Sequence, residues 1–239
     1  MSSSPNIHHR PHCHRHRLNR VVGCGLRAAL PVVAFVVILA SAATRAPAHP
    51  VSFEGATQLM IEAGEDMQMF ELYHSITASQ AFGPHFLRLD GKGVERDLMA
   101  LQYNRLLKRW NLPDAQANIY AGIGAGASYD RGPDRWSPAM VAIWQADYET
   151  RRIYTAYEGM AWFGDGFTHV GNSIGLGVAP YLAEFDELNT WLLLKARHVS
   201  EFDNQIEVMP MLRFFYRNLF LEVGATLDGN PQVNFMIHF

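Results

Sequence analysis

The sequence predicts an all-β protein, a closed antiparallel transmembrane β-barrel of about 12 strands that follows a cleaved N-terminal signal peptide. Three observations carry this prediction: a basic and then apolar leader, a period-two alternation throughout residues 49–239, and a final strand that ends in an aromatic residue. In that strand Val233, Phe235 and Ile237 alternate with Gln232 and Asn234. Because successive side chains of a strand point to opposite faces, such alternation indicates a sheet with one apolar and one polar face.

The leader is predicted to be a signal peptide over residues 1–48, which leaves residues 49–239 as the barrel domain. Five arginines before residue 28 form a basic region, residues 31–40 form an apolar region, and Ala46-Pro47-Ala48 gives a cleavage site before His49. The apolar stretch is shorter than the ~20 residues of a membrane-spanning helix. An uncleaved anchor is the alternative.

The charge balance changes at this boundary. Residues 1–48 hold six Arg and no acidic residue, so residues 49–239 carry 14 basic and 23 acidic residues, a net charge of −9 with His neutral. This acidic balance argues against a nucleic-acid partner. Cys13 and Cys24, the two cysteines of the chain, both lie in the leader, so no disulfide is expected in the barrel.

Twelve strand-like runs follow in order, separated by Gly-, Asp-, Asn- and Pro-containing turns. Each is about the ~9–11 residues that a tilted membrane strand requires, and the even number returns both ends of the barrel to the periplasmic side. Pro84 and Pro210 interrupt two of the runs and predict bulges. The runs are 53–62, 67–74, 80–89, 98–110, 116–126, 139–148, 152–163, 167–179, 189–198, 205–217, 219–227 and 232–239.

The alternation assigns apolar residues to lipid and polar residues to the lumen. A soluble, periplasmic lipocalin-like ligand-binding barrel would give the same pattern with the faces exchanged. The polar face carries too many charges for a dry core, where each unpaired charge costs several kcal/mol, and this favours the membrane. In the fourth run, residues 98–110, the alternation places Lys108 on the inner face and Arg109 on the outer face. The predicted lumen residues are Gln102, Asn104, Lys108, Asp147, Lys195, Arg197, Glu207, Arg213 and Glu222.

The stretch around His169 and Ser173 resembles the H-x-S-N element of outer-membrane phospholipases and lipid A deacylases, in which Ser is the nucleophile and His the base. Here the nucleophile position is Gly171, which cannot be acylated. The alternation of side chains along this strand places His169, Gly171 and Ser173 on the lumen face. A lipid acyl-hydrolase that uses a degenerate His169/Ser173 site is therefore an alternative function, and no catalytic residue is assigned.

Mixed charge signs on the inner face predict ion pairs that occlude a narrow lumen, since a selective channel would show one sign. The histidines have no compact metal-binding spacing, so neither a metal nor another cofactor is expected. These histidines are His74, His85, His169, His198 and His238.

The segments Leu107–Asp114 (LKRWNLPD), Thr190–Leu194 and Leu212–Phe215 resemble those of a family of small, uncharacterised proteobacterial outer-membrane proteins. The terminal strand, with Phe235, Ile237 and Phe239, resembles the assembly signal of outer-membrane barrels. The resemblance implies the outer membrane as location, with outer-membrane lipid and lipopolysaccharide and the barrel-assembly machinery as partners. It implies no activity. The sequence thus predicts a monomeric, non-enzymatic envelope barrel, either a narrow channel or a structural component.

Overall fold

The computed structural model describes residues 49–91, 93–200 and 205–239. The predicted signal peptide, residues 1–48, therefore lies outside the described residues. Within the described ranges, no helix is both long enough and apolar enough to cross a membrane.

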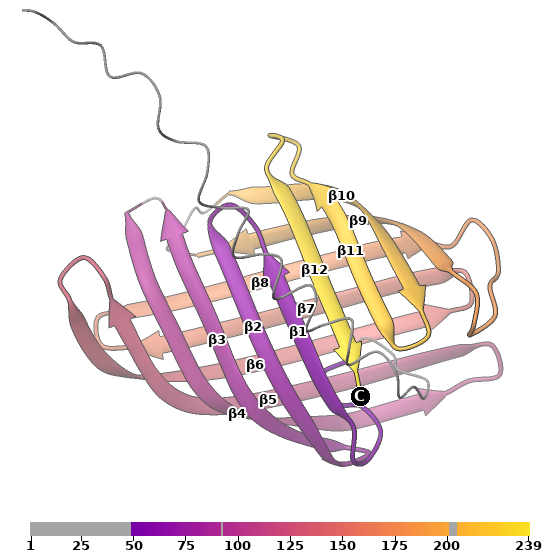
Figure 1. Cartoon of the computed structure of the whole chain (residues 1–239), viewed down its shortest axis with the longest axis horizontal. Helices are drawn as coiled ribbons and strands as arrows, with labels where there is room; N and C mark the ends of the chain where they lie inside the picture. The colour runs from indigo at the N-terminus through magenta and orange to yellow at the C-terminus, as the bar shows by residue number, and fades with distance from the viewer. Residues whose placement is uncertain (1–48, 92, 201–204) are drawn as a thin grey trace, which may run out of the picture. The chain divides into compact units, whose positions relative to one another are not determined.

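Twelve strands make up the described part of the chain, and they confirm the predicted all-β class and strand number (Figure 1). Six of the twelve are longer than the sequence pattern suggested, because pairing continues beyond the predicted run at one or both ends. The strands are β1 Thr57–Ala63, β2 Met67–Thr77, β3 Gln80–Gly91, β4 Val94–Asn111, β5 Ala115–Asp130, β6 Arg135–Thr150, β7 Ile153–Gly164, β8 Phe167–Val178, β9 Asn189–Val199, β10 Ile206–Tyr216, β11 Leu219–Ala225 and β12 Pro231–His238.

The strands form one closed antiparallel barrel in which each strand pairs with its neighbours in sequence. The ring closes between β1 and β12, which lie side by side in Figure 1, with Met60 opposite Met236. Beyond the last strand residue, the backbone of Phe239 exchanges two hydrogen bonds with Thr57, at 2.8 and 2.9 Å. Since every strand has two partners, the sheet has no free edge.

The outer wall is apolar over the middle of the strands. Ile123 on β5 and Met140 on β6 are 66% and 60% exposed, and they lie on the strand faces opposite to the buried polar residues. Leu101, Ile174, Leu176, Leu192, Leu194, Leu212 and Val233 belong to the same outer surface.

The inside of the barrel has an apolar part and a polar part. Leu87, Leu98, Val141, Trp162 and Phe167 belong to a buried cluster that fills the side formed by β3, β4, β6, β7 and β8. A cavity remains on the side formed mainly by β1, β2 and β7–β12. This division places the polar lumen residues around a limited space.

Two register shifts mark the strands, between Ser75 and Thr77 on β2 and between Leu106 and Lys108 on β4. The bulges predicted at Pro84 and Pro210 are wrong, since both prolines pair one-to-one with a residue of the next strand. A proline removes one N–H donor from the ladder without inserting a residue.

The bulge on β4 reverses the parity of the residues that follow it, so the predictions for Lys108 and Arg109 are both wrong. Lys108 pairs with outward-facing Ile119 and lies 5.8 Å from the ring centre of Trp110 on the outer wall. Arg109 points inward instead, where its Nε donates to Asn118 Oδ1 at 2.6 Å. One inserted residue moves every later side chain to the other face.

Candidate functional site: the barrel lumen

The polar part of the lumen lines a cavity of about 210 Å³. Of the predicted lumen residues, Lys195, Arg197, Arg213 and Glu222 line this cavity. Glu207 also faces inward, on β10 beside Arg197. Gln102, Asn104 and Asp147 are buried inside the barrel but away from the cavity wall.

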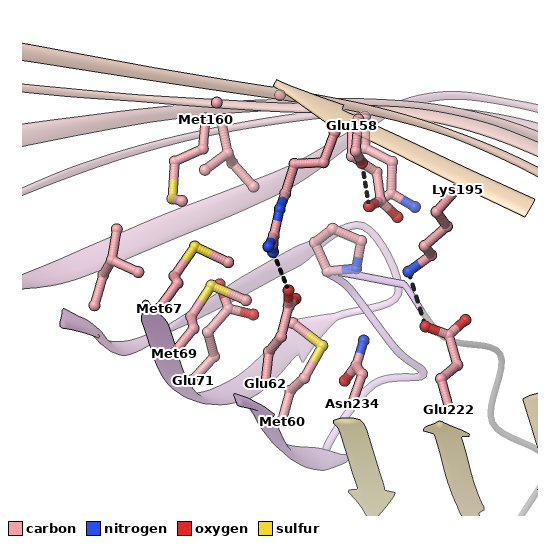
Figure 2. A pocket seen from close by; sticks show the side chains of 18 of the residues that line it. Met60, Glu62, Met67, Met69, Glu71, Glu158, Met160, Lys195, Glu222 and Asn234 are labelled. Atoms are coloured by element: carbon pink, nitrogen blue, oxygen red, sulfur yellow. Dashed lines mark hydrogen bonds and ion pairs between the residues drawn. The ribbon is translucent and has the colours of Figure 1, made fainter. Parts of the chain in front are cut away.

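The first ion cluster centres on Glu222, whose side chain is fully buried. Glu222 accepts hydrogen bonds from Lys195 Nζ at 2.8 Å and from Arg213 Nε at 2.6 Å, so three strands are joined (Figure 2 shows the Lys195 contact). The Arg213 guanidinium also lies 4.1 Å from the ring centre of Tyr154 on β7, three strands away around the ring. The two cations neutralise the buried carboxylate without water, and the cluster keeps a net charge of +1.

The second cluster centres on Arg197. Its NH1 donates to Glu62 at 3.1 Å, and its Nε and NH2 donate to Glu207 at 2.9 and 2.8 Å. Glu62 belongs to β1 and Arg197 to β9, four strands apart around the ring. The pair therefore spans the lumen between non-adjacent strands and narrows the passage.

A third network consists of hydrogen bonds. The Tyr73 hydroxyl donates to Glu71 at 3.0 Å, and His85 Nδ1 lies 2.8 Å from Gln102 Oε1, so Nδ1 carries the proton. Gln102 in turn donates to Asn104 Oδ1 at 2.7 Å. This chain runs along the inner faces of β2, β3 and β4 and explains why uncharged polar residues are buried there.

The segment before β1 enters the barrel at the end where the chain termini of the described residues lie, here called the terminal end. His49 is 4% exposed, stacks on Tyr120 with ring centres 5.3 Å apart, and has Nδ1 3.4 Å from Asp147 Oδ2. Val51 packs against Tyr73 and Tyr120 in a buried cluster. The segment fills the lumen at this end.

Burial, with the positive charge of Arg109 nearby, lowers the pKa of His49 to about 3. The imidazole is therefore neutral near pH 7, and its contact with Asp147 is not an ion pair under those conditions. The docked segment consequently brings no net side-chain charge from His49 into the lumen.

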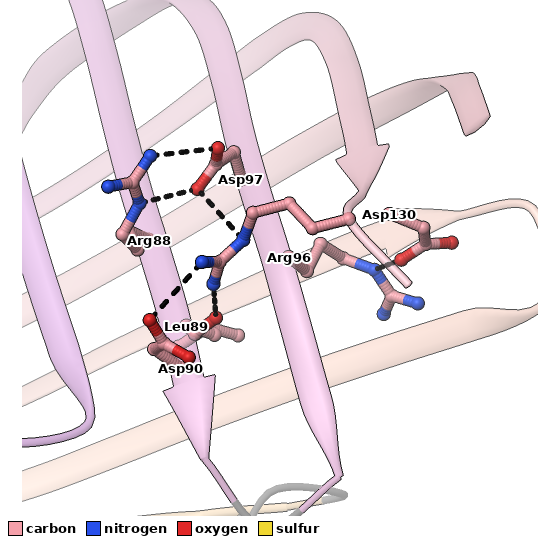
Figure 3. Close-up of polar contacts among 7 residues, drawn as sticks. Arg88, Leu89, Asp90, Arg96, Asp97 and Asp130 are labelled. Atoms are coloured by element: carbon pink, nitrogen blue, oxygen red, sulfur yellow. Dashed lines mark hydrogen bonds and ion pairs between the residues drawn. The ribbon is translucent and has the colours of Figure 1, made fainter. Parts of the chain in front are cut away.

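At the opposite end, here called the far end, charged residues lie on both faces of the wall (Figure 3). On the outside, Arg88 donates to Asp97 through Nε at 2.7 Å and through NH2 at 3.0 Å, and Arg131 reaches Asp90 at 3.2 Å. On the inside, Arg96 pairs with Asp130. The outer pairs mark where the apolar band of the wall ends.

The structure does not bring together the two residues of the hydrolase alternative. Ser173 and His169 both face the lumen, but they are four residues apart on one strand, a separation of roughly 13 Å. Ser173 Oγ donates to Glu158 at 3.1 Å, whereas His169 Nε2 lies 2.7 Å from Arg96 NH1. A serine nucleophile needs its base within hydrogen-bond reach, so these two side chains do not form a dyad.

The predicted assembly-signal residues lie on the C-terminal strand that closes the ring. Phe235 and Ile237 on β12 pair with Ile61 and Leu59 of β1, on the parity opposite to the lumen residues of β12. Phe239 follows β12 and completes its pairing with β1.

Two features of the lumen are absent from the sequence-based prediction. One is the docked segment that begins at His49. The other is the methionine content of the cavity wall, which holds Met60, Met67, Met69, Met160, Met209, Met211 and Met236. The sequence does contain a signal for the methionine content: Met-x-Met occurs at residues 67–69 and 209–211, at strand positions whose side chains face the lumen. Within the described ranges, no group of three or more His, Cys, Asp or Glu side chains is arranged to hold a metal ion.

No protein-family model matches the sequence, and no curated protein matches it. Several solved structures match the chain at low sequence identity. The chain is similar to the KdgM porin in complex with disordered oligogalacturonate (7% identity, 77% of this chain and 98% of that chain, TM-score 0.45). It is also similar to LpxR from Salmonella typhimurium (10% identity, 77% and 99% coverage, TM-score 0.40) and to a loop-deletion variant of OmpT from Vibrio cholerae (8% identity, 77% and 98% coverage, TM-score 0.30).

The class that the structure itself defines is a closed twelve-stranded antiparallel β-barrel with an apolar outer wall and a charged interior.

Proposed function

We propose that this protein is a non-enzymatic outer-membrane barrel whose lumen is closed at rest and forms a narrow passage for small solutes. The observation that carries the proposal is the separation of the two strand faces. On β9, for example, Leu192 and Leu194 are exposed on the outside, while Lys195 and Arg197 form ion pairs on the inside. A soluble barrel would need the opposite arrangement, with its charges in water.

A bilayer is the environment that matches the length of the strands and the apolar outer wall. Strands of 11–12 residues such as β2, β3 and β7 have the length that crosses a bilayer with a tilt. A closed ring leaves no backbone donor or acceptor unpaired in lipid. The export signal, insertion through the C-terminal strand by the assembly machinery, and contact with outer-membrane lipid and lipopolysaccharide belong to the same proposal.

Two features support a closed resting state. The ion pair between Arg197 and Glu62 joins non-adjacent strands across the lumen, and the segment from His49 fills the terminal end. The remaining space of about 210 Å³ has room for a few waters or one small solute, because a water occupies ~30 Å³ in the liquid. An open porin channel would be continuous and much wider.

The location is tested by fractionating cells that produce the full chain and running the membrane fraction on a detergent gel with and without boiling. A band in the outer-membrane fraction that changes mobility on boiling is the expected result. Recovery in the soluble periplasm with a single mobility would contradict the proposal and favour the ligand-binding barrel with exchanged faces.

Closure is tested by conductance in planar bilayers. Wild-type barrels are expected to show little conductance, and Val51→Lys is expected to raise it, since a lysine cannot stay in the apolar contact with Tyr73 and Tyr120. Glu54→Lys, at an exposed position of the same segment, is the matched control. Large wild-type conductance, or no response to Val51→Lys, would contradict closure by this segment.

A further inference from the structure

The methionines of the barrel are concentrated on one surface. Residues 49–239 contain nine methionines, and seven of them line the lumen cavity. The other two, Met99 and Met140, are exposed on the outer wall. Filling of an apolar core alone does not account for this distribution, because the same cavity is lined by four carboxylates.

Four of the seven side chains are only partly buried and point into the cavity. Met60 comes from β1, Met67 and Met69 come from β2, and Met160 comes from β7, which is six strands from β1 around the ring in either direction. Figure 2 shows these four side chains directed toward the same space. Thioethers from opposite walls therefore meet at one cavity.

Two carboxylates next to these methionines have no Lys or Arg partner, and His85 Nδ1 lies 3.3 Å from Glu71 Oε1. Glu62 and Glu222 are paired with arginine or lysine, as described above. Among the described residues, no Lys or Arg nitrogen lies within 4 Å of Glu71 or Glu158, which are held by hydrogen bonds from Tyr73 and Ser173. Glu71 is two residues from Met69 on β2, and Glu158 is two residues from Met160 on β7 (Figure 2).

The chemistry of this wall favours one class of ligand. A thioether is a neutral, polarisable donor that prefers soft ions such as Cu(I), whereas Ca²⁺ and Mg²⁺ prefer oxygen ligands. A single positive charge in a partly apolar cavity needs a compensating negative charge nearby. Methionine sulfur supplies the ligands, and Glu158 together with the ionised form of Glu71 supplies the charge.

We propose that the lumen binds a soft monovalent metal ion, Cu(I) or Ag(I), through the thioethers of Met60, Met67, Met69 and Met160, with Glu71 and Glu158 as the compensating charges. Lys195, Arg213 and Glu222 together carry a net charge of +1, and the neighbouring cluster of Arg197, Glu62 and Glu207 offsets it with a net charge of −1. The unbranched methionine side chains can adjust their rotamers to approach one ion.

This inference deepens the proposed function, because it names the class of solute that the barrel holds and rests on the barrel being folded as described. Its test is independent of conductance. A protein that fails to show the heat-dependent mobility shift argues against the proposed barrel. A correctly folded barrel without methionine-dependent binding argues against the metal site alone.

The experiment is equilibrium dialysis of the purified, folded chain in detergent against Ag(I), and against Cu(I) held reduced in the presence of a Cu(I) chelator. We expect saturable binding, and we expect the triple variant Met60→Leu, Met67→Leu, Met69→Leu to bind about 10- to 100-fold more weakly. Leucine keeps the apolar volume and removes the sulfur, so the barrel is expected to keep its mobility shift.

The matched control is Met99→Leu with Met140→Leu, which removes two thioethers from the outer wall and is expected to leave the affinity unchanged. Any binding by Cys13, Cys24 or the leader histidines is the same in every variant and cancels in the comparison. Trp162 gives an optical readout, because its Nε1 donates to Met160 Sδ at 3.3 Å and ion binding there is expected to quench its fluorescence.

Equal affinity of the triple variant and the wild type would overturn the proposal, as would the absence of saturable binding to the folded wild type. If the triple variant does not fold, the single variant Met160→Leu on the opposite wall provides the same test. Glu71→Gln with Glu158→Gln is expected to weaken binding while leaving the thioethers in place.

Discussion

Replacing Glu222 by Gln tests whether the ion clusters hold the barrel together. The substitution keeps the shape of the side chain but leaves Lys195 and Arg213 without their shared carboxylate, from which they are 2.8 and 2.6 Å away. Removing one partner of a buried ion pair costs about 3–5 kcal/mol. With a urea dependence of roughly 2 kcal/mol per M, the unfolding midpoint of the barrel is expected to fall by about 2 M.

The assay is urea unfolding of the barrel in detergent micelles, followed by tryptophan fluorescence and by the fraction that shows the folded mobility. Adding Lys195→Met to Glu222→Gln restores the charge of the cluster and is expected to recover about 1–3 kcal/mol relative to the sum of the single changes. Glu184→Gln breaks an exposed turn pair with Arg151 and is expected to cost under about 1 kcal/mol. A Glu222→Gln cost as small as that of the control would refute the reasoning.

Three further outcomes are expected. Ile123→Lys, which places a charge on the lipid-facing wall, should lower barrel insertion by about 2–4 kcal/mol, while Leu227→Lys in the exposed turn after β11 should not; equal folded fractions would contradict the membrane-facing assignment. The pKa of His49 is lowered to about 3 when the segment is docked, so protonation favours the undocked segment. The free energy that favours docking is therefore at its full value above pH 6.5, and it falls by ~1.4 kcal/mol per pH unit as the pH falls toward 3. Wild-type conductance should therefore rise between pH 6.5 and 5, and His49→Gln should remove this rise. Gly126→Ala should destabilise the barrel by about 1–3 kcal/mol in urea unfolding, since its Cβ would lie 1.9 Å from the carbonyl oxygen of Met99, whereas Gly171→Ala, 3.8 Å from its nearest neighbour, should be tolerated.

The alternation of apolar and polar residues was sufficient to predict the fold and the side of most lumen residues. Parity along a strand is a local property, so Lys195 and Arg197 could be placed inside from β9 alone. The bulge near Leu106 could not be predicted, because it depends on how β4 pairs with β5. That single insertion reversed the predictions for Lys108 and Arg109.

The composition of the cavity was also beyond the sequence pattern. Methionine occurs on either face of a strand, so the sequence alone could not show that Met60 and Met160 share a cavity. Their proximity follows from ring closure, which places β1 opposite β7. The segment from His49 shows no alternation that would assign it to the lumen. Its position depends on contacts with Tyr73 and Tyr120, which are far from it in sequence.

The central claim is that the apolar face of each strand meets lipid and the charged face meets the lumen. The most direct measurement is the environment of single cysteines at neighbouring positions of β8, because residues 49–239 contain no cysteine of their own. A fluorophore at Ile174→Cys is expected to be quenched by lipids that carry a quencher in the acyl chain, and one at Ser173→Cys is expected not to be. Quenching with the opposite parity, or equal quenching at both positions, would contradict the account.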